Sequence, residues 1–340
     1  MPTPFDDMRA LLAACPDSDE AARASVIKRQ GTLAKPLGSL GRLEDVVAHL
    51  AAWQGKAQPV MMRPMICVFA ANHGVVAQGV SAFPSDVTAL MLKAYGAGGG
   101  TINQICAAYE FGFKAFELAL EMPTADFTQG PALDEKACVA TMAFGMEALA
   151  GGVDVLGLGE MGIGNTTSAA AIYAALYGGD PDRFVGIGAG ADDAQLARKK
   201  QAVRQGLARH ADCLEDPLAI LAALGGREIA AMTGAILAAR LQHVPVVLDG
   251  YVVTAAAAVL HAIEPDSISH CIAGHCSAEG AHREVLERLG LVPMLDLGMR
   301  LGEGTGAAFA MALIKGALAC YNNTHSLQQI GVVPPASELH

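Results

Sequence analysis

Short apolar runs alternate with longer, alanine-rich stretches along most of the chain. Each run is bounded by turn residues and is short enough to be a single strand. The predicted strands are residues 65–70, 114–118, 154–158, 183–187, 244–248, 267–273 and 292–295. The stretches with a helical pattern between them are residues 167–176, 193–210, 227–241, 252–263, 278–289 and 307–321. This alternation predicts an α/β fold, with a mostly parallel sheet and helices on both faces.

The N-terminal part of the chain has a different pattern. It contains apolar positions at helical spacing on both sides of a loop with Pro and Gly at residues 35–41, and it contains no convincing strand. We therefore predict a helical cap at residues 1–60 and an α/β domain at residues 61–314.

Composition and charge exclude several classes of protein. Apolar residues make up 52% of the 340 residues, which is too many for a disordered chain. The chain has 23 Lys and Arg against 34 Asp and Glu, a net charge of -11, so we expect no nucleic-acid partner. The longest uncharged run, residues 161–179, contains glycines and polar residues that a lipid-facing helix avoids, and residues 1–9 lack a signal pattern. We expect a cytoplasmic protein with no stable membrane insertion.

The cysteines do not form a metal-binding pattern. None of the 8 cysteines belongs to a Cys-x-x-Cys pair. Cys271 and Cys276 lie close to His270 and His275, but the second, distant ligand pair of a zinc site is missing. We expect reduced cysteines and no metal.

Glycine or polar residues follow the predicted strands. Ligands of open α/β sheets bind beyond the carboxyl ends of the strands, so these residues are predicted to meet at one site. The side chains that carry chemistry at these positions are His73, Glu160, Asp249, His275, Ser277 and, on the last loop, Glu303.

Two interpretations compete for the glycine-rich segment after residues 154–158. Gly157, Gly159 and Gly162 fit the G-x-G-x-x-G fingerprint of dinucleotide-binding proteins, which would make the chain an NAD-binding oxidoreductase. Against this, Glu160 stands where a pyrophosphate would approach, and no acidic residue ends the next strand. This interpretation is the weaker one.

The residues just beyond the fingerprint predict a phosphate site. Gly164, Asn165, Thr166 and Thr167 open a helix, where free backbone N–H groups and hydroxyls favour an anion. In the alternative interpretation, Asn165 or Thr166 merely caps the helix. One lysine of the cluster at residues 198–200 could also reach the phosphate, although such clusters usually face solvent.

Two glutamates lie in similar contexts. Residues 301–308 repeat the order Leu-Gly-Glu, glycines, Thr and an alanine-rich helix that is seen at residues 158–171. Glu160 and Glu303 could therefore be a general base and a supporting partner, or simply acidic residues near helix N-termini. His73 and His275 are more often orienting than catalytic at such positions. Asp249, followed by Gly250, could hold ribose hydroxyls.

Taken together, these motifs resemble one family, the nicotinate-nucleotide–dimethylbenzimidazole phosphoribosyltransferases. The similarity covers nearly the whole chain in order, through residues 35–44, 71–74, 159–167, 234–250, 275–279 and 299–306. The resemblance implies a Rossmann-like sheet, a small helical domain built from both chain ends (residues 1–60 completed by residues 315–340), and a homodimer. It implies neither a metal nor a cofactor.

The resemblance also implies an activity, which belongs to the assembly of the lower nucleotide loop of cobalamin. The 5-phosphoribosyl group of nicotinate mononucleotide would pass to 5,6-dimethylbenzimidazole, giving α-ribazole 5′-phosphate and nicotinate. Glu303 matches the general base of the family and Glu160 its second carboxylate, while Phe83 and Met91 stand where some relatives have polar residues in the base pocket. The accepted base could therefore differ, for example adenine or a phenolic base. The candidate substrate-binding residues are Gly162, Gly164, Asn165, Thr166, Thr167, Lys199, Asp249, Gly250, Ser277, His73, Phe83 and Met91.

Overall fold

The computed structural model describes residues 3–332 and contains a parallel sheet. Its five strands are hydrogen-bonded in the order β2-β1-β3-β4-β5, and every neighbouring pair is parallel. The strands are β1 (Pro64–Ala70), β2 (Gly112–Glu117), β3 (Val155–Met161), β4 (Val246–Leu248) and β5 (Cys271–Ala273). The predicted α/β fold is confirmed.

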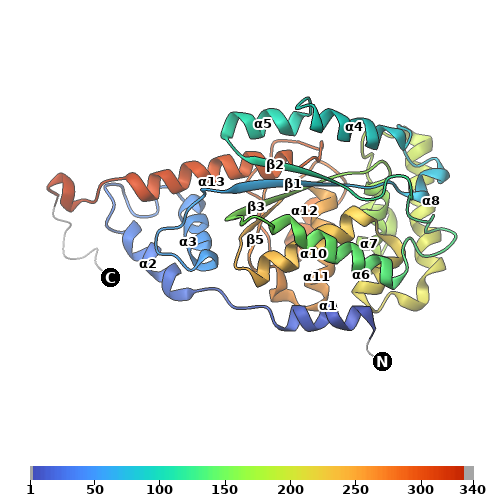
Figure 1. Cartoon of the computed structure of the whole chain (residues 1–340), viewed down its shortest axis with the longest axis horizontal. Helices are drawn as coiled ribbons and strands as arrows, with labels where there is room; N and C mark the ends of the chain where they lie inside the picture. Colours follow the sequence, from blue (N-terminus) through green and yellow to red (C-terminus); the bar gives the residue numbers. More distant parts are fainter. Residues whose placement is uncertain (1–2, 333–340) are drawn as a thin grey trace.

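Helices cover both faces of this sheet (Figure 1). Successive side chains of a strand point to opposite faces, and on β1 Cys67 and Phe69 join one apolar cluster while Ile66 and Val68 join the other. The first cluster contains side chains of α7, α10 and α11, and the second those of α3, α5 and α13. The α-helices are α1 (Pro4–Ala13), α2 (Glu20–Gln30), α3 (Arg42–Gln54), α4 (Asp86–Gly96), α5 (Thr101–Tyr109), α6 (Glu135–Met146), α7 (Asn165–Tyr177), α8 (Asp193–Arg209), α9 (Pro217–Leu224), α10 (Arg227–Leu241), α11 (Tyr251–Ile263), α12 (His282–Arg288) and α13 (Thr305–Asn323).

Small residues let two of these helices approach closely. A Cβ atom on Gly145 of α6 would overlap the backbone of Ala231 in α10, and one on Gly234 of α10 would overlap the backbone of Met142. The glycine content of the chain is therefore needed in part for helix packing.

The predicted strand at residues 183–187 is wrong. A 3₁₀ helix, η3 (Pro181–Phe184), forms there instead, and the side chain of Asp180 caps it by accepting the Asp182 N–H at 3.1 Å. Phe184 is fully buried and its ring centroid lies 6.1 Å from that of Tyr173. Phe184 packs on α7, and Ile187 is 43% exposed at the cavity, so this segment does not join the sheet.

Three other predicted segments are shorter in the structure. A 3₁₀ helix, η5 (Pro265–Ile268), takes the first part of residues 267–273, and β5 begins only at Cys271. Residues 292–295 contribute a single bridge, between Leu295 and His275. The helix predicted at residues 278–289 starts at His282, because a turn with Gly280 in the left-handed region (φ 46°) precedes it.

The N-terminal helices lie in two places. α1 packs on α6, and the backbone N–H of Phe5 donates to Glu135 at 2.9 Å. α2 and α3 pack on each other, α3 packs on α13, and Leu33 pairs with Ser326 (Figure 1). The domain boundaries at residues 60/61 and 314/315 stay a prediction, since α13 runs through the second of them. Residues 1–2 and 333–340 of the predicted cap lie outside the described residues.

None of the helices within residues 3–332 combines the length and the apolar character needed to cross a membrane.

Candidate active site

A cavity of about 400 Å³ lies where the carboxyl ends of β3, β4 and β5 meet the loop before α13. Such a volume suits a small organic ligand. It is lined by most of the residues predicted from the sequence, namely Phe83, Met91, Glu160, Gly162, Gly164, Asn165, Thr166, Lys199, Gly250, Ser277 and Glu303. Three predicted residues, His73, Thr167 and Asp249, are buried outside its lining.

Glu160 stands at the end of β3, under the glycine-rich loop that precedes α13. The side-chain amide of Asn165 donates to its Oε2 atom, and a Cβ atom on Gly302 would overlap Oε1. Burial raises the pKa of Glu160 to about 8, and the negative charges of Asp249 and Glu228 add to this rise. At neutral pH the unliganded site therefore holds Glu160 mostly in its neutral form.

Glu303 lies in a strained part of the backbone. Its φ is 61°, between Gly302 at 82° and Gly304 at 78°, so three successive residues are left-handed. A non-glycine residue rarely adopts this conformation, and such strain is frequent at functional sites. The Glu303 N–H donates to the carbonyl of Glu160 at 3.2 Å, which ties the two glutamates together. Burial raises the pKa of Glu303, the Tyr95 hydroxyl opposes the rise, and Asp249 adds to it.

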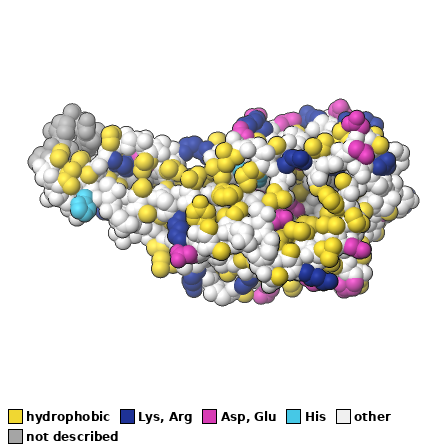
Figure 2. All heavy atoms as spheres, turned by 90° about the horizontal axis from the view of Figure 1, so that it is seen from above, with side chains coloured by type: hydrophobic (Ala, Val, Ile, Leu, Met, Phe, Trp, Pro, Cys, Tyr) yellow, Lys and Arg dark blue, Asp and Glu magenta, His cyan; other side chains and the backbone are white. Residues whose placement is uncertain are grey.

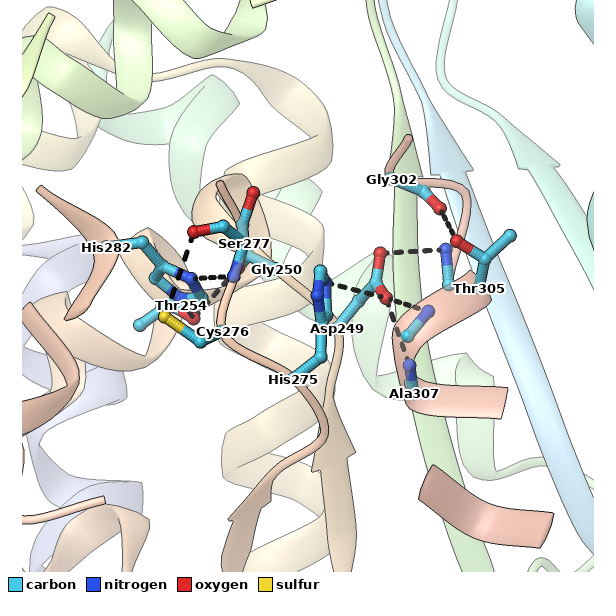
Figure 3. A network of polar contacts seen from close by, with 12 residues as sticks. Asp249, Gly250, Thr254, His275, Cys276, Ser277, His282, Gly302, Thr305 and Ala307 are labelled. Atoms are coloured by element: carbon cyan, nitrogen blue, oxygen red, sulfur yellow. Dashed lines mark hydrogen bonds and ion pairs between the residues drawn. The ribbon is translucent and has the colours of Figure 1, made fainter. Parts of the chain in front are cut away.

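Asp249 lies between His275 and the start of α13 and holds this loop (Figure 3). Its carboxylate accepts the N–H groups of Gly306 at 2.6 Å, Ala307 at 3.0 Å and Gly304 at 3.1 Å. These are the free amides at the start of α13, where a negative charge is favoured. The Nε2 atom of His275 lies 3.7 Å from the carboxylate on its other side. Asp249 therefore fixes the N-terminus of α13, and its oxygens are engaged there rather than in the cavity.

A second set of contacts fixes Ser277 at the cavity wall (Figure 3). The Ser277 N–H donates to Nδ1 of His282 at 2.8 Å, so the ring proton sits on Nε2 and points to the Thr254 hydroxyl at 2.9 Å. That hydroxyl in turn donates to the carbonyl of Gly250 at 2.8 Å. Burial lowers the pKa of His282 to about 3, which keeps this ring neutral.

The start of α7 faces the cavity without a side-chain cap. Gly164 is its N-cap, with φ at 94°, and the N–H groups of Asn165 and Thr167 donate only to the backbone carbonyls of Gly162 at 3.1 Å and Gly164 at 3.0 Å. The alternative interpretation, a plain helix cap, does not apply, because Asn165 binds Glu160 and Thr166 accepts from Lys199 at 3.0 Å. Lys199 is buried and also donates to the carbonyl of Gly186 at 2.7 Å. Burial lowers the pKa of Lys199, whereas Glu279 acts in the opposite direction.

His73 lies behind the start of α7. Its Nε2 atom is 2.6 Å from Glu228 and its Nδ1 atom 3.1 Å from the hydroxyl of Ser168 in α7. All three side chains are buried. The arrangement gives His73 an orienting contact with α7.

Several residues of the site were not found from the sequence. Both carboxylate oxygens of Glu279 accept the N–H of Gly188 at 2.9 Å, and Arg300 donates to the carbonyl of Gly188 at 2.9 Å. Glu279 lies in the motif at residues 275–279 and Arg300 in the motif at residues 299–306, so these motifs could have indicated both residues. Tyr95, beside Glu303, belongs to no motif.

The glycine fingerprint has a packing function. Gly157 and Gly159 lie inside β3 rather than in a turn. A Cβ atom on Gly159 would overlap the backbone of Gly304, and one on Gly157 would overlap Ile66. Close contact with the α13 loop explains these glycines, and the oxidoreductase interpretation loses its support. Among residues 3–332, no three His, Cys, Asp or Glu side chains form a group that could hold a metal ion.

The chain is similar to known proteins over most of its length. A family model described as Phosphoribosyltransferase matches residues 15–332, which defines the class of the protein. Proteins named nicotinate-nucleotide–dimethylbenzimidazole phosphoribosyltransferase are similar over most of the chain. The one from Methylocella silvestris is 59% identical over 94% of this chain and 93% of its own length. The one from Brucella anthropi is 56% identical over 97% of both chains.

Solved structures give the same result. The crystal structure of the Thermus thermophilus protein of that name matches with a TM-score of 0.84 and 39% identity, over 93% of this chain and 100% of that one. A second, called CobT, from the same organism matches with a TM-score of 0.85 and 40% identity, at the same coverage. The chain belongs to the nicotinate-nucleotide–dimethylbenzimidazole phosphoribosyltransferase family.

Proposed function

We propose that the chain transfers the 5-phosphoribosyl group of nicotinate mononucleotide to 5,6-dimethylbenzimidazole, for cobalamin lower nucleotide loop assembly. The products are α-ribazole 5′-phosphate and nicotinate. The observation that carries the proposal is the pairing, in one cavity, of an open anion site at α7 with a buried carboxylate, Glu303.

Glu303 acts as the general base. One nitrogen of the benzimidazole attacks the anomeric carbon, while the other nitrogen passes its proton to Glu303. The bond from that carbon to nicotinate breaks, and nicotinate leaves with the electron pair. A neutral azole gains from a base, and the raised pKa of Glu303 brings its basicity closer to neutral pH. The ionised form of Glu160 favours the positive charge that develops on the ribosyl ring.

The phosphate of the nucleotide binds at the start of α7. Backbone N–H groups and the helix dipole favour an anion there, and Lys199 supplies a positive charge. The Thr166 hydroxyl and Ser277, both in the cavity wall, are further donors.

The base occupies the apolar end of the cavity. Phe83 and Met91 line this end, together with Val87 of α4. Their side chains suit the two methyl groups of dimethylbenzimidazole. Transfer to a different lower-ligand base, such as adenine or a phenol, is the second possibility, because an apolar wall discriminates weakly between flat rings.

We also propose that the protein is a homodimer. Support comes from α13, where Phe309 is 37% and Leu313 is 43% exposed on one helix face. Exposed apolar side chains that lie together mark association surfaces.

The decisive experiment is product analysis after mixing the protein and nicotinate mononucleotide with a panel of bases. We expect α-ribazole 5′-phosphate and free nicotinate in equal amounts, with dimethylbenzimidazole the fastest acceptor. Glu303→Gln is the control variant, because Gln keeps the shape but cannot take a proton. We expect it to lower turnover by about 10²–10⁴-fold while nucleotide binding is kept. Near-parental turnover of Glu303→Gln would show that another group takes the proton, and a nicotinamide-dependent redox reaction in place of transfer would overturn the proposal.

A further inference from the structure

One face of α4 connects the cavity wall to the carboxylate of Glu303. Val87 and Met91 line the cavity from this helix. Tyr95 comes one turn after Met91, and residues four apart lie on the same helix face. Tyr95 therefore continues this face behind the cavity lining, where it is only 2% exposed.

Two buried polar atoms meet at this point. The Tyr95 hydroxyl and the Oε2 atom of Glu303 are both shielded from solvent, and neither forms a hydrogen bond within residues 3–332, with each other included. The hydroxyl is close enough to the carboxyl group to affect its proton affinity. A buried donor or acceptor without a partner costs about 1–3 kcal/mol, so native proteins rarely leave one. A hydrogen bond from the Tyr95 hydroxyl to Oε2 of Glu303 would remove both costs at once.

The Tyr95 ring has little freedom to turn away. A Cβ atom on Gly100 would lie 2.5 Å from its Cδ1 atom, so the ring fills that space. The ring of Phe113 packs edge-on at 5.9 Å between centroids, and Asn103 donates to the Tyr95 carbonyl at 3.2 Å. A residue that only filled this apolar pocket would need no hydroxyl.

The other charged groups around Glu303 do not supply this contact. Asp249 and Glu160 are acidic groups that raise rather than lower the pKa of their neighbours, and His275 faces the far side of Asp249. Arg300, on the same loop as Glu303, donates to the carbonyl of Gly188. Tyr95 is thus the neutral donor that faces the carboxylate from α4.

We propose that Tyr95 is a positioning residue, which donates its hydroxyl hydrogen to Oε2 of Glu303 and so presents Oε1 to the incoming base. The inference rests on the proposed function, in which Glu303 accepts the proton of the azole. Anchoring one carboxylate oxygen fixes the rotation of a side chain whose backbone is already strained, and it stabilises the ionised form.

The test is the pH profile of kcat/KM for Tyr95→Phe. The hydroxyl stabilises the carboxylate, so its removal raises the pKa of Glu303, and the base then loses its ionised form at a higher pH. The acid limb is expected to move up by about one pH unit, which lowers kcat/KM about tenfold at acidic pH. At alkaline pH the loss is expected to be only a few-fold. KM for nicotinate mononucleotide stays unchanged, because the phosphate site is not touched.

Tyr177→Phe is the matched control. The Tyr177 hydroxyl is also buried without a partner among the described residues, but it belongs to the far end of α7. This variant should keep the parental profile. A purely structural role for Tyr95 predicts instead a lower Tm and an equal loss of activity at every pH. That result, or an unmoved acid limb, overturns the inference.

Failure of this inference can be told apart from failure of the proposed function. If Glu303→Gln is inactive and Tyr95→Phe has the parental profile, only the role of Tyr95 is withdrawn. If Glu303→Gln turns over like the parent, the base assignment itself is withdrawn. The double variant gives a further check: Tyr95→Phe should have no added effect on pH dependence once Glu303 is Gln.

Discussion

At the scale of single residues, the site contains three neighbouring carboxyl groups, those of Asp249, Glu160 and Glu303. Asp249 stays bound to three backbone amides, and Glu160 and Glu303 have raised pKa values because they share a buried environment. The repeated Leu-Gly-Glu order was enough to pair Glu160 with Glu303 from the sequence. Tyr95 could not be found in this way, because its proposed contact with Glu303 joins residues that are far apart in the chain.

The raised pKa of Glu160 has a consequence for stability. The folded state favours the neutral acid, with a pKa of about 8 against an ordinary 4.5. This contribution is fully present below pH 4.5 and is lost as the pH rises through 8. At pH 7 folding keeps Glu160 from ionising as it does in the unfolded chain, and Gln has no such ionisation to lose. For Glu160→Gln the free energy of unfolding should therefore rise by up to about 3 kcal/mol at pH 7 and by much less at pH 4. Activity should fall, but less than for Glu303→Gln.

Denaturant unfolding at several pH values checks this prediction. The exposed residue Glu264 offers a control, since Glu264→Gln should leave the pH dependence unchanged. Equal stability of Glu160→Gln and the parent at every pH would contradict the raised pKa.

At the scale of elements, the positions of the chemical groups follow from the ends of the strands. The predicted runs at β1 to β5 were found, because parallel strands buried on both faces are nearly continuous apolar runs. Residues 183–187 have the same appearance but pack on α7, and pattern alone cannot tell a buried loop from a strand. Whether an apolar segment joins the sheet depends on which distant residues it contacts. A short stretch of sequence does not contain that information.

The start of α7 carries the prediction about phosphate. Lys199 donates to Thr166 of this helix, and both line the cavity. Lys199→Met keeps the length of the side chain but removes its charge, so KM for nicotinate mononucleotide should rise about tenfold or more, with little change in KM for the base. Steady-state kinetics with each substrate varied in turn separates the two constants.

A neighbouring residue provides the control for this variant. Arg198 lies next to Lys199 on α8 but donates outward to the carbonyl of Gly79 at 2.8 Å, so Arg198→Met should keep the parental KM. Crystals soaked with the nucleotide should show the phosphate at residues 164–167. A parental KM in Lys199→Met, or phosphate density elsewhere, would refute the assignment of this loop.

At the scale of the whole molecule, α13 connects the parts. It begins at the loop that carries Glu303, crosses one face of the sheet and ends beside α2 and α3 (Figure 1). Figure 2 shows hydrophobic side chains gathered on the upper face of the molecule, over which α13 runs in Figure 1. The sequence predicted this helix from its apolar pattern, but the pattern is apolar nearly all round, so it did not reveal which side would be left uncovered.

The exposed side of α13 leads to a prediction about assembly. Phe309, Leu313, Gly316 and Cys320 recur at helical spacing and are all exposed, and none of them carries a charge. A helix face that meets only water normally carries polar side chains.

We therefore expect Leu313→Asp to convert the proposed dimer into a monomer, since a buried carboxylate without a partner is strongly unfavourable in an interface. Sedimentation analysis should show half the parental mass, and circular dichroism should show an unchanged helix content. Met122→Asp is the control, because Met122 is also exposed, at 57%, but lies in the loop after β2. A parental dimer in Leu313→Asp would show that this face of α13 is not the contact between subunits, and a monomeric parent protein would remove the homodimer proposal altogether.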